Sequence, residues 1–111
     1  MENKFRVEVR NENGASLLSV AGELDLASGP TLERELESAL AREPGLVILD
    51  LRQLEFMDST GLSVLIRAHN SAQAQGQRLG IVGGSRQVRR LLSLTGVAER
   101  LTIVDSPEQL R

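Results

Sequence analysis

The sequence predicts a single α/β domain over residues 1–111, with a mixed, mostly parallel sheet of about five strands and about four helices. Two observations lead to this fold class. Short apolar stretches alternate with segments whose apolar residues recur at helical spacing, and this order requires right-handed crossovers between parallel strands. The chain opens differently, with two strand-like stretches joined by a tight turn, which predicts an antiparallel hairpin at one edge of the sheet.

The hairpin and the first helix follow from local patterns. Apolar residues alternate with charged ones over residues 5–10, and Asn13-Gly14 is a strong turn signal before the returning strand at 15–21. The next segment repeats its apolar residues at i, i+4, i+7 and i+8, namely Leu32, Leu36, Ala39 and Leu40. Asp25 or Ser28 is suited to cap this helix, and Pro30 fits only its first turn.

The rest of the chain alternates strands and helices. Residues 46–51 are almost continuously apolar, as expected of a central strand covered on both faces. The second helix follows Ser59 and ends at Gly76. Further strands are predicted at 79–82 and 101–104, on either side of a third helix that opens at Gly83-Gly84-Ser85 and closes at Gly96-Val97. Ser106-Pro107 opens a short terminal helix.

The composition excludes several functions. A formal net charge of −2, with Phe5 and Phe56 as the only aromatic residues, argues against general nucleic-acid or anionic-membrane binding. Cysteine is absent, so thiolate metal sites are excluded, and no apolar run approaches the roughly 20 residues that span a bilayer. Residues 1–5 contain no apolar signal core. We expect a soluble, cytoplasmic protein without a cofactor.

The catalytic alternatives are weak. The only histidine, His69, lies roughly 15 Å along the same helix from Ser59, too far to activate it, and the G-x-S-x-G elbow is missing. Glu23, Asp25 and Asp58 share one end of the sheet only if their loops meet, and would then hold Mg²⁺ weakly. We therefore expect no enzyme and no metal site.

The glycine-rich stretch at residues 80–85 lies where phosphate-binding loops occur. It lacks the lysine of a Walker loop and the spacing of a dinucleotide fingerprint, so we interpret it as a tight turn with Ser85 as a helix cap. Direct nucleotide binding near Asp25, Asp58 and Gly84 is a weaker alternative.

The run from Met57 to Leu62 is the most informative feature of the chain. It places Ser59 and Thr60 at a helix amino end, where Asp58 or Ser59 is the expected cap. A cap does not explain the second hydroxyl, the adjacent carboxylate, or Gly61 in a turn where a better helix former would serve folding. A small, exposed helix start of this kind suits docking into another protein's active site.

These residues resemble the STAS domain family, and within it the bacterial anti-sigma factor antagonists. The resemblance covers about residues 5–110. It is carried by the stretches Gly22–Asp25, Val47–Leu51, Phe56–Leu62, Gly83-Gly84 and Leu94–Val97, of which Asp58-Ser59-Thr60-Gly61-Leu62 is the most specific.

The resemblance implies a partner-switching role. The unmodified antagonist binds an anti-sigma factor, which is itself a serine kinase, and so releases the sigma factor. Phosphorylation of Ser59 (Thr60 is the alternative) ends the binding, and a phosphatase restores it. The expected partner-binding residues are Asp25, Asp58, Ser59, Thr60, Gly61, Leu62, Gly84 and Ser85.

Two points stay open at this stage. Chemistry alone does not separate Ser59 from Thr60, because both are hydroxyls at the same helix tip. A STAS scaffold or transport-accessory module without a phosphorylation cycle is the alternative function. We expect a monomer or weak dimer.

Overall fold

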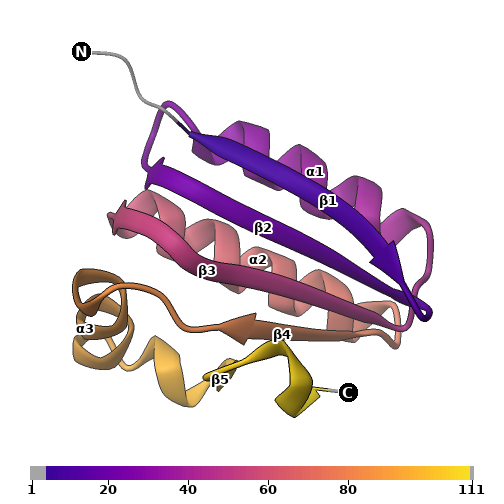
Figure 1. The fold of residues 1–111 in the computed structure, drawn as a ribbon. Helices are drawn as coiled ribbons and strands as arrows, with labels where there is room; N and C mark the ends of the chain where they lie inside the picture. Colours follow the sequence, from indigo (N-terminus) through magenta and orange to yellow (C-terminus); the bar gives the residue numbers. More distant parts are fainter. Residues whose placement is uncertain (1–4, 111) are drawn as a thin grey trace.

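The computed structural model describes residues 5–110 as one sheet with α-helices behind it (Figure 1). The strands are β1 (Arg6–Glu12), β2 (Ala15–Leu24), β3 (Leu46–Met57), β4 (Arg78–Val82) and β5 (Thr102–Val104). The helices are α1 (Gly29–Ala41), α2 (Ser59–Ala74) and α3 (Arg86–Leu94), with short 3-10 helices η1 (Val97–Glu99) and η2 (Pro107–Leu110). The predicted domain bounds also include residues 1–4 and 111, which lie outside the described residues.

The sheet has the predicted topology. Its strands are ordered β1-β2-β3-β4-β5, β1 is antiparallel to β2, and the remaining neighbours are parallel. Asn13 and Gly14 connect β1 to β2 with φ of 49° and 80°, and a two-residue loop with both φ angles positive is the turn whose twist matches a hairpin. The predicted edge hairpin is therefore confirmed.

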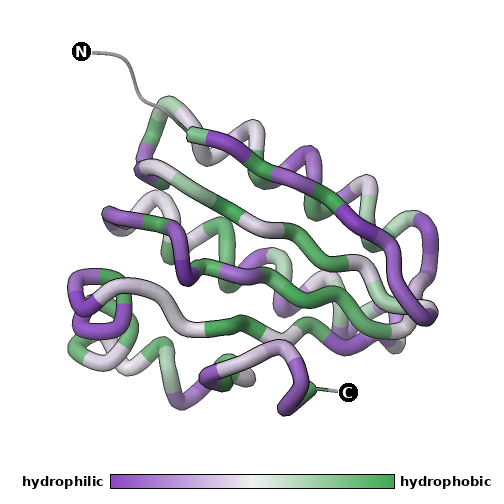
Figure 2. Tube along the Cα trace, in the orientation of Figure 1, coloured by the Kyte–Doolittle hydropathy of each residue, from purple (hydrophilic) through white to green (hydrophobic). Residues whose placement is uncertain are grey.

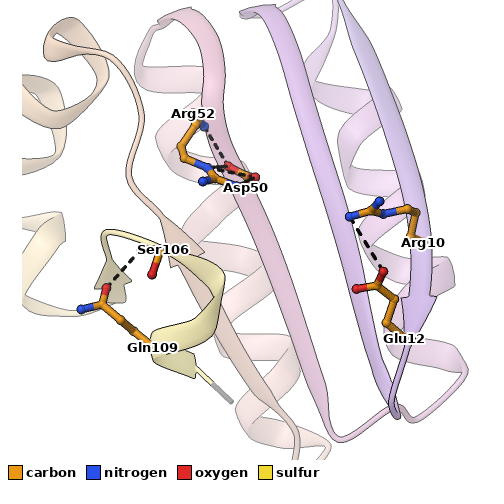
Figure 3. A network of polar contacts seen from close by, with 6 residues as sticks. All are labelled: Arg10, Glu12, Asp50, Arg52, Ser106 and Gln109. Carbon is orange, nitrogen blue, oxygen red and sulfur yellow. Dashed lines mark hydrogen bonds and ion pairs between the residues drawn. The ribbon is translucent and has the colours of Figure 1, made fainter.

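Two elements differ from the sequence-based expectation. The central strand β3 continues past residue 51 to Met57, because β2 also continues and pairs with it after register shifts at Ser19/Ala21 and Gly22/Glu23. The predicted terminal helix is the 3-10 helix η2, which the side-chain oxygen Oε1 of Gln109 caps by accepting from the Asp105 and Ser106 amides (Figure 3). The longer β3 carries the chain directly to the candidate site.

The core lies mainly between the sheet and the helices. Its fully buried side chains are aliphatic, and they include Leu18, Leu49 and Leu65. A smaller cluster on the opposite face of the sheet is formed by Leu17, Ile48, Val82 and Leu110, the last contributed by η2. In Figure 2 green accordingly dominates the first half of β3, whereas β1 alternates between hydrophilic and hydrophobic residues. None of the helices in residues 5–110 combines the length and apolar character needed to cross a membrane.

Candidate functional site

The ends of β2 and β3 form the base of the candidate site. These strands are parallel, and their last residues, Leu24 and Met57, are register partners. The Asp58 N–H extends the ladder by donating to the Leu24 carbonyl at 3.3 Å. Asp25 and Asp58 therefore begin neighbouring loops at one end of the sheet, as the predicted site requires.

Asp58 is the N-cap of α2. Its backbone is extended, with φ −111° and ψ −168°, and its Oδ1 accepts from the Thr60 N–H at 2.9 Å and the Gly61 N–H at 3.3 Å. These bonds satisfy amide groups that have no partner inside the helix. Of the two expected caps, the carboxylate of Asp58 is the one used.

The two hydroxyls at this helix start have different surroundings. Ser59 is the first residue of α2, and its side chain is exposed. Thr60 is half-buried, and its Cγ2 methyl faces α1: a Cβ built on Gly29 would lie 3.3 Å from it. Within residues 5–110 the Ser59 hydroxyl makes no hydrogen bond, although its carbonyl accepts one from the Ser63 hydroxyl at 3.2 Å.

Gly61 and Leu62 are buried beneath this exposed tip. A Cβ on Gly61 would lie 2.4 Å from Met57 Cγ and 3.0 Å from Leu24 Cδ2, so the start of α2 packs too closely against the strand ends for any side chain. Packing therefore explains the glycine that the sequence analysis took as a sign of docking. The exposed Ser59 hydroxyl remains as the feature that folding alone does not require.

Asp25 organises the loop between β2 and α1. Its Oδ1 accepts from the Ala27 N–H at 3.0 Å and the Ser28 N–H at 3.2 Å. Ser28 occupies the N-cap position of α1 without capping through its side chain; its hydroxyl donates to the Glu23 carbonyl at 2.7 Å and accepts from the Asp25 N–H at 3.0 Å. This network holds the α1 start beside the α2 start.

The start of α3 lies next to the site because it packs against β3. A Cβ on Gly84 would lie 2.5 Å from the Leu51 carbonyl oxygen, which accounts for a glycine there. Ser85 caps α3 by accepting from the Val88 N–H at 3.4 Å, so its predicted capping role is confirmed.

Gln87 is a site residue that sequence reasoning missed. Its Oε1 accepts from the Met57 N–H at 3.0 Å, and its Nε2 donates to the Met57 carbonyl at 2.9 Å. The amide thus pairs with the edge of β3 as another strand would, immediately before Asp58. No sequence signal marks this role, since the side chain is one polar residue among several on a polar helix.

Two large apolar side chains were also missed. Leu26, next to Asp25, is 78% exposed, and Phe56, two residues before Asp58, is 40% exposed. Burial of exposed apolar side chains stabilises protein interfaces, and aromatic residues such as Phe are enriched in their cores. Leu26 could have been identified from the sequence, because it is an apolar residue inside a loop of polar and small residues.

The His, Asp and Glu side chains of residues 5–110 form no group of three that could hold a metal ion. His69 is half-buried and lines a cavity of about 160 Å³ with Ala72 and Gln77, near the far end of α2. It therefore lies at the boundary between the buried and the exposed side of α2.

Asp50 belongs to a separate ion pair on β3 (Figure 3). The Arg52 Nη2 lies 2.7 Å from Asp50 Oδ2, and the Arg52 N–H donates to Asp50 Oδ1 at 3.0 Å. Burial by itself raises the pKa of the Asp50 carboxyl. Hydrogen bonds from the Arg52 side chain and backbone, together with its charge, outweigh burial and hold that pKa below its ordinary value.

Comparison with known proteins identifies the family. The model of the STAS domain matches residues 6–110. This chain belongs to the STAS domain family. The STAS domain is 33% identical over 95 residues to the anti-sigma-F factor antagonist RsfB of Mycobacterium tuberculosis, an alignment that covers 86% of this chain and 77% of RsfB.

Two further relatives agree with this assignment. The anti-sigma-B factor antagonist of Bacillus subtilis is 30% identical over 99 residues, covering 89% of this chain and 90% of the relative. The crystal structure of an anti-sigma factor antagonist from Mycobacterium paratuberculosis superposes with a TM-score of 0.87 at 26% identity, covering 96% of this chain and 90% of that one. The expected family and fold are both confirmed, and all three relatives are named as anti-sigma factor antagonists.

Proposed function

We propose that this STAS domain is an anti-sigma factor antagonist controlled by phosphorylation. Its unphosphorylated form binds an anti-sigma factor that is itself a serine kinase, and this binding releases the sigma factor. Phosphorylation of Ser59 ends the binding, and a phosphatase restores it. The names of the relatives support the antagonist role, and the exposed Ser59 hydroxyl at the start of α2 is the observation that supports the switch.

Accessibility favours Ser59 over Thr60 as the acceptor. A kinase must bring its nucleotide to the acceptor oxygen, so the side chain has to project from the surface. Ser59 is exposed, whereas Thr60 is half-buried with its methyl group against the α1 start. We therefore infer that phosphate is added at Ser59.

A phosphate at this position is compatible with the fold. The amino end of the 16-residue α2 carries a partial positive charge that stabilises anions. The Asp58 carboxylate already accepts from the Thr60 and Gly61 amides, so the cap stays in place when Ser59 is modified. Modification then changes the surface without requiring a rearrangement of the domain.

The same phosphate opposes partner binding. It adds about −1.5 to −2 charges at neutral pH, next to Asp58 and close to Asp25. A partner shaped to receive an uncharged hydroxyl would bury part of this charge without compensation, which costs several kcal/mol. Binding energy for the unmodified form comes from the exposed Leu26 and Phe56 side chains, which lie within three residues of the two aspartates.

The proposed partner surface follows from these roles. Asp25, Asp58, Ser59 and Thr60 supply its polar groups, and Gly61 and Leu62 support it from beneath. Gly84 and Ser85, at the α3 start, lie along the adjoining part of β3. Gln87 fixes the end of that strand.

The test is phosphorylation by an anti-sigma factor kinase with ATP, followed by intact-mass measurement. We expect one added phosphate on the wild-type chain and none on Ser59→Ala. Ser63→Ala is the matched control, because Ser63 is exposed one helical turn further along α2 and should leave phosphorylation intact. Phosphate retained by Ser59→Ala would contradict the assignment, and binding without any phosphorylation would favour the scaffold alternative.

A further inference from the structure

The outer edge of β1 has the properties of a pairing surface. β1 is the first strand in the sheet order, and within residues 5–110 no strand lies beyond it. In a hairpin with a two-residue turn, the pair that flanks the turn, here Glu12 and Ala15, is hydrogen-bonded, and bonded pairs then alternate with unbonded ones. The N–H and C=O groups of Val7, Val9 and Asn11 therefore point away from β2.

The side chains of β1 form an alternating pattern. Because Val7 packs against the main core, the alternating residues Arg6, Glu8, Arg10 and Glu12 project from the sheet face opposite the helices, where Figure 3 shows Arg10 and Glu12; positive and negative charges therefore alternate along one face. Val7 and Val9 project from the other face. Val7 packs against the main core, whereas Val9 lies further along the edge and is 41% exposed.

We propose that β1 pairs antiparallel with β1 of a second copy of this chain, about a two-fold axis at Val9. In this register Val9 lies opposite Val9 of the second copy, and Glu8 lies opposite its Arg10. Arg6 similarly lies opposite Glu12 of the second copy. Every charged residue of the strand meets the opposite charge, and the two exposed valines cover each other.

The backbone is compatible with this register. A two-fold axis at Val9 makes Val9 and its copy a hydrogen-bonded pair, which matches the outward direction of its N–H and C=O groups. Glu8 and Arg10 of the second copy then form an unbonded pair, in which opposing side chains are closest. With the axis at Glu8 or Arg10 instead, the same outward backbone groups would still pair, but like charges would lie opposite each other, so the charges select the axis at Val9.

Edge strands usually carry charge to prevent such pairing. Charges of one sign repel any copy of the same strand, but the alternating signs of β1 are self-complementary. The existing contact between Arg10 Nη2 and Glu12 Oε2 is 3.9 Å long and joins the exposed Arg10 to the half-buried Glu12, so it is a weak ion pair. A hollow of about 230 Å³ between β1 and α1, lined partly by Val9, Asn11 and Ala39, provides space beside the axis.

This dimer is independent of the proposed switch. Arg6, at the start of β1, pairs with Ala21 and so lies toward the Ser59 end of the sheet, while the axis passes through the middle of the strand. The two Ser59 sites would face opposite ends of a continuous sheet, and both would stay exposed. Failure of the dimer would leave the phosphorylation proposal intact, and the reverse is also true.

Disulfide trapping tests the register. The chain has no cysteine, so Val9→Cys and Asn11→Cys each introduce a single thiol. Cys at position 9 faces its copy at about 5.5 Å between Cα atoms, within disulfide range, whereas two Cys at position 11 are about 14 Å apart. We expect mild oxidation to give at least tenfold more covalent dimer for Val9→Cys. Equal yields for the two variants would overturn the register.

Sedimentation equilibrium tests the charge pattern, up to concentrations on the order of 1 mM because a single strand pair is a small interface. Arg10→Glu should weaken dimerisation roughly tenfold or more, since it places like charges opposite each other twice. The double variant Glu8→Arg/Arg10→Glu should restore wild-type dimerisation. Circular dichroism confirms folding of each variant. A monomeric wild-type chain at the highest concentration, or a double variant as weak as Arg10→Glu, would overturn the proposal.

Discussion

The amino ends of α2 and α3 follow neighbouring parallel strands, and each carries a serine within two residues of a glycine. At α2 the cap is Asp58, which accepts two amide hydrogen bonds and leaves the Ser59 side chain exposed. At α3 Ser85 is itself the cap, and its hydroxyl also lies 3.5 Å from the Glu55 carbonyl. A serine near a helix start is thus available for modification only when another residue caps the helix.

The glycines at the two helix starts are both closely packed, but against different groups. Gly61 is enclosed by the flexible side chains of Met57 and Leu24, whereas Gly84 lies against the backbone carbonyl of Leu51. Both positions hold their helix start close to β3. Close packing therefore fixes both helix starts, and only the choice of cap makes one of them a modification site.

The largest expected effect comes from charge at position 59. Ser59→Glu should weaken binding to the anti-sigma factor at least a hundredfold, because a carboxylate in the contact surface mimics part of the phosphate charge. Ser59→Ala should bind within about threefold of wild type, as loss of an exposed hydroxyl costs little. Titration calorimetry measures both. The Ser85→Glu variant, changed at the other helix start, should bind more tightly than Ser59→Glu. The reverse order would contradict the claim that the α2 start is the modification site.

The next largest effect concerns packing beneath Ser59. Gly61→Ala places a Cβ where only 2.4 Å separates it from Met57 Cγ, and overpacking of this kind costs about 1–3 kcal/mol of unfolding free energy. Urea denaturation measures the change. Ser63→Ala, on the exposed side of the same helix, is the control and should stay within about 0.5 kcal/mol of wild type.

Removal of each cap residue compares how much the two caps contribute to the free energy of unfolding. Asp58→Ala should lower the unfolding free energy by about 1 kcal/mol, since two amides at 2.9 and 3.3 Å lose their acceptor. Ser85→Ala should cost less, about 0.5 kcal/mol, because its single bond to Val88 is 3.4 Å long. Equal losses in urea denaturation would show that cap geometry does not separate the two helix starts.

The smallest expected effect concerns the pH dependence of folding stability. It involves Asp50, a carboxylate outside the candidate site that serves as a reference. The pKa of Asp50 is lower in the folded chain than its ordinary value, so the contribution of its pair with Arg52 is complete above about pH 4 and is lost as pH falls through the folded pKa. Asp50→Asn should therefore flatten the acid side of the stability profile, by less than about 1 kcal/mol because Arg52 is exposed. An unchanged profile in thermal melts would contradict this assignment.

The sequence predicted the parts of this site that follow from local patterns. Apolar spacing located the strands and helices, and the aspartate before two hydroxyls located a capped helix start. The stretch around Ser59 also carried the family resemblance. Gln87, by contrast, could not be identified, because its two bonds to Met57 join residues 30 positions apart in the chain.

The sequence by itself determined the order of strands and helices, the edge hairpin and the helix start that carries Ser59, since each depends on residues a few positions apart. Only the tertiary structure decided how the two hydroxyls differ, why Gly61 is a glycine, and which side chains surround the site. The physical reason is that exposure and close packing depend on neighbours from other elements: the half-burial of Thr60 requires α1 beside it, and Gly61 requires the ends of β2 and β3.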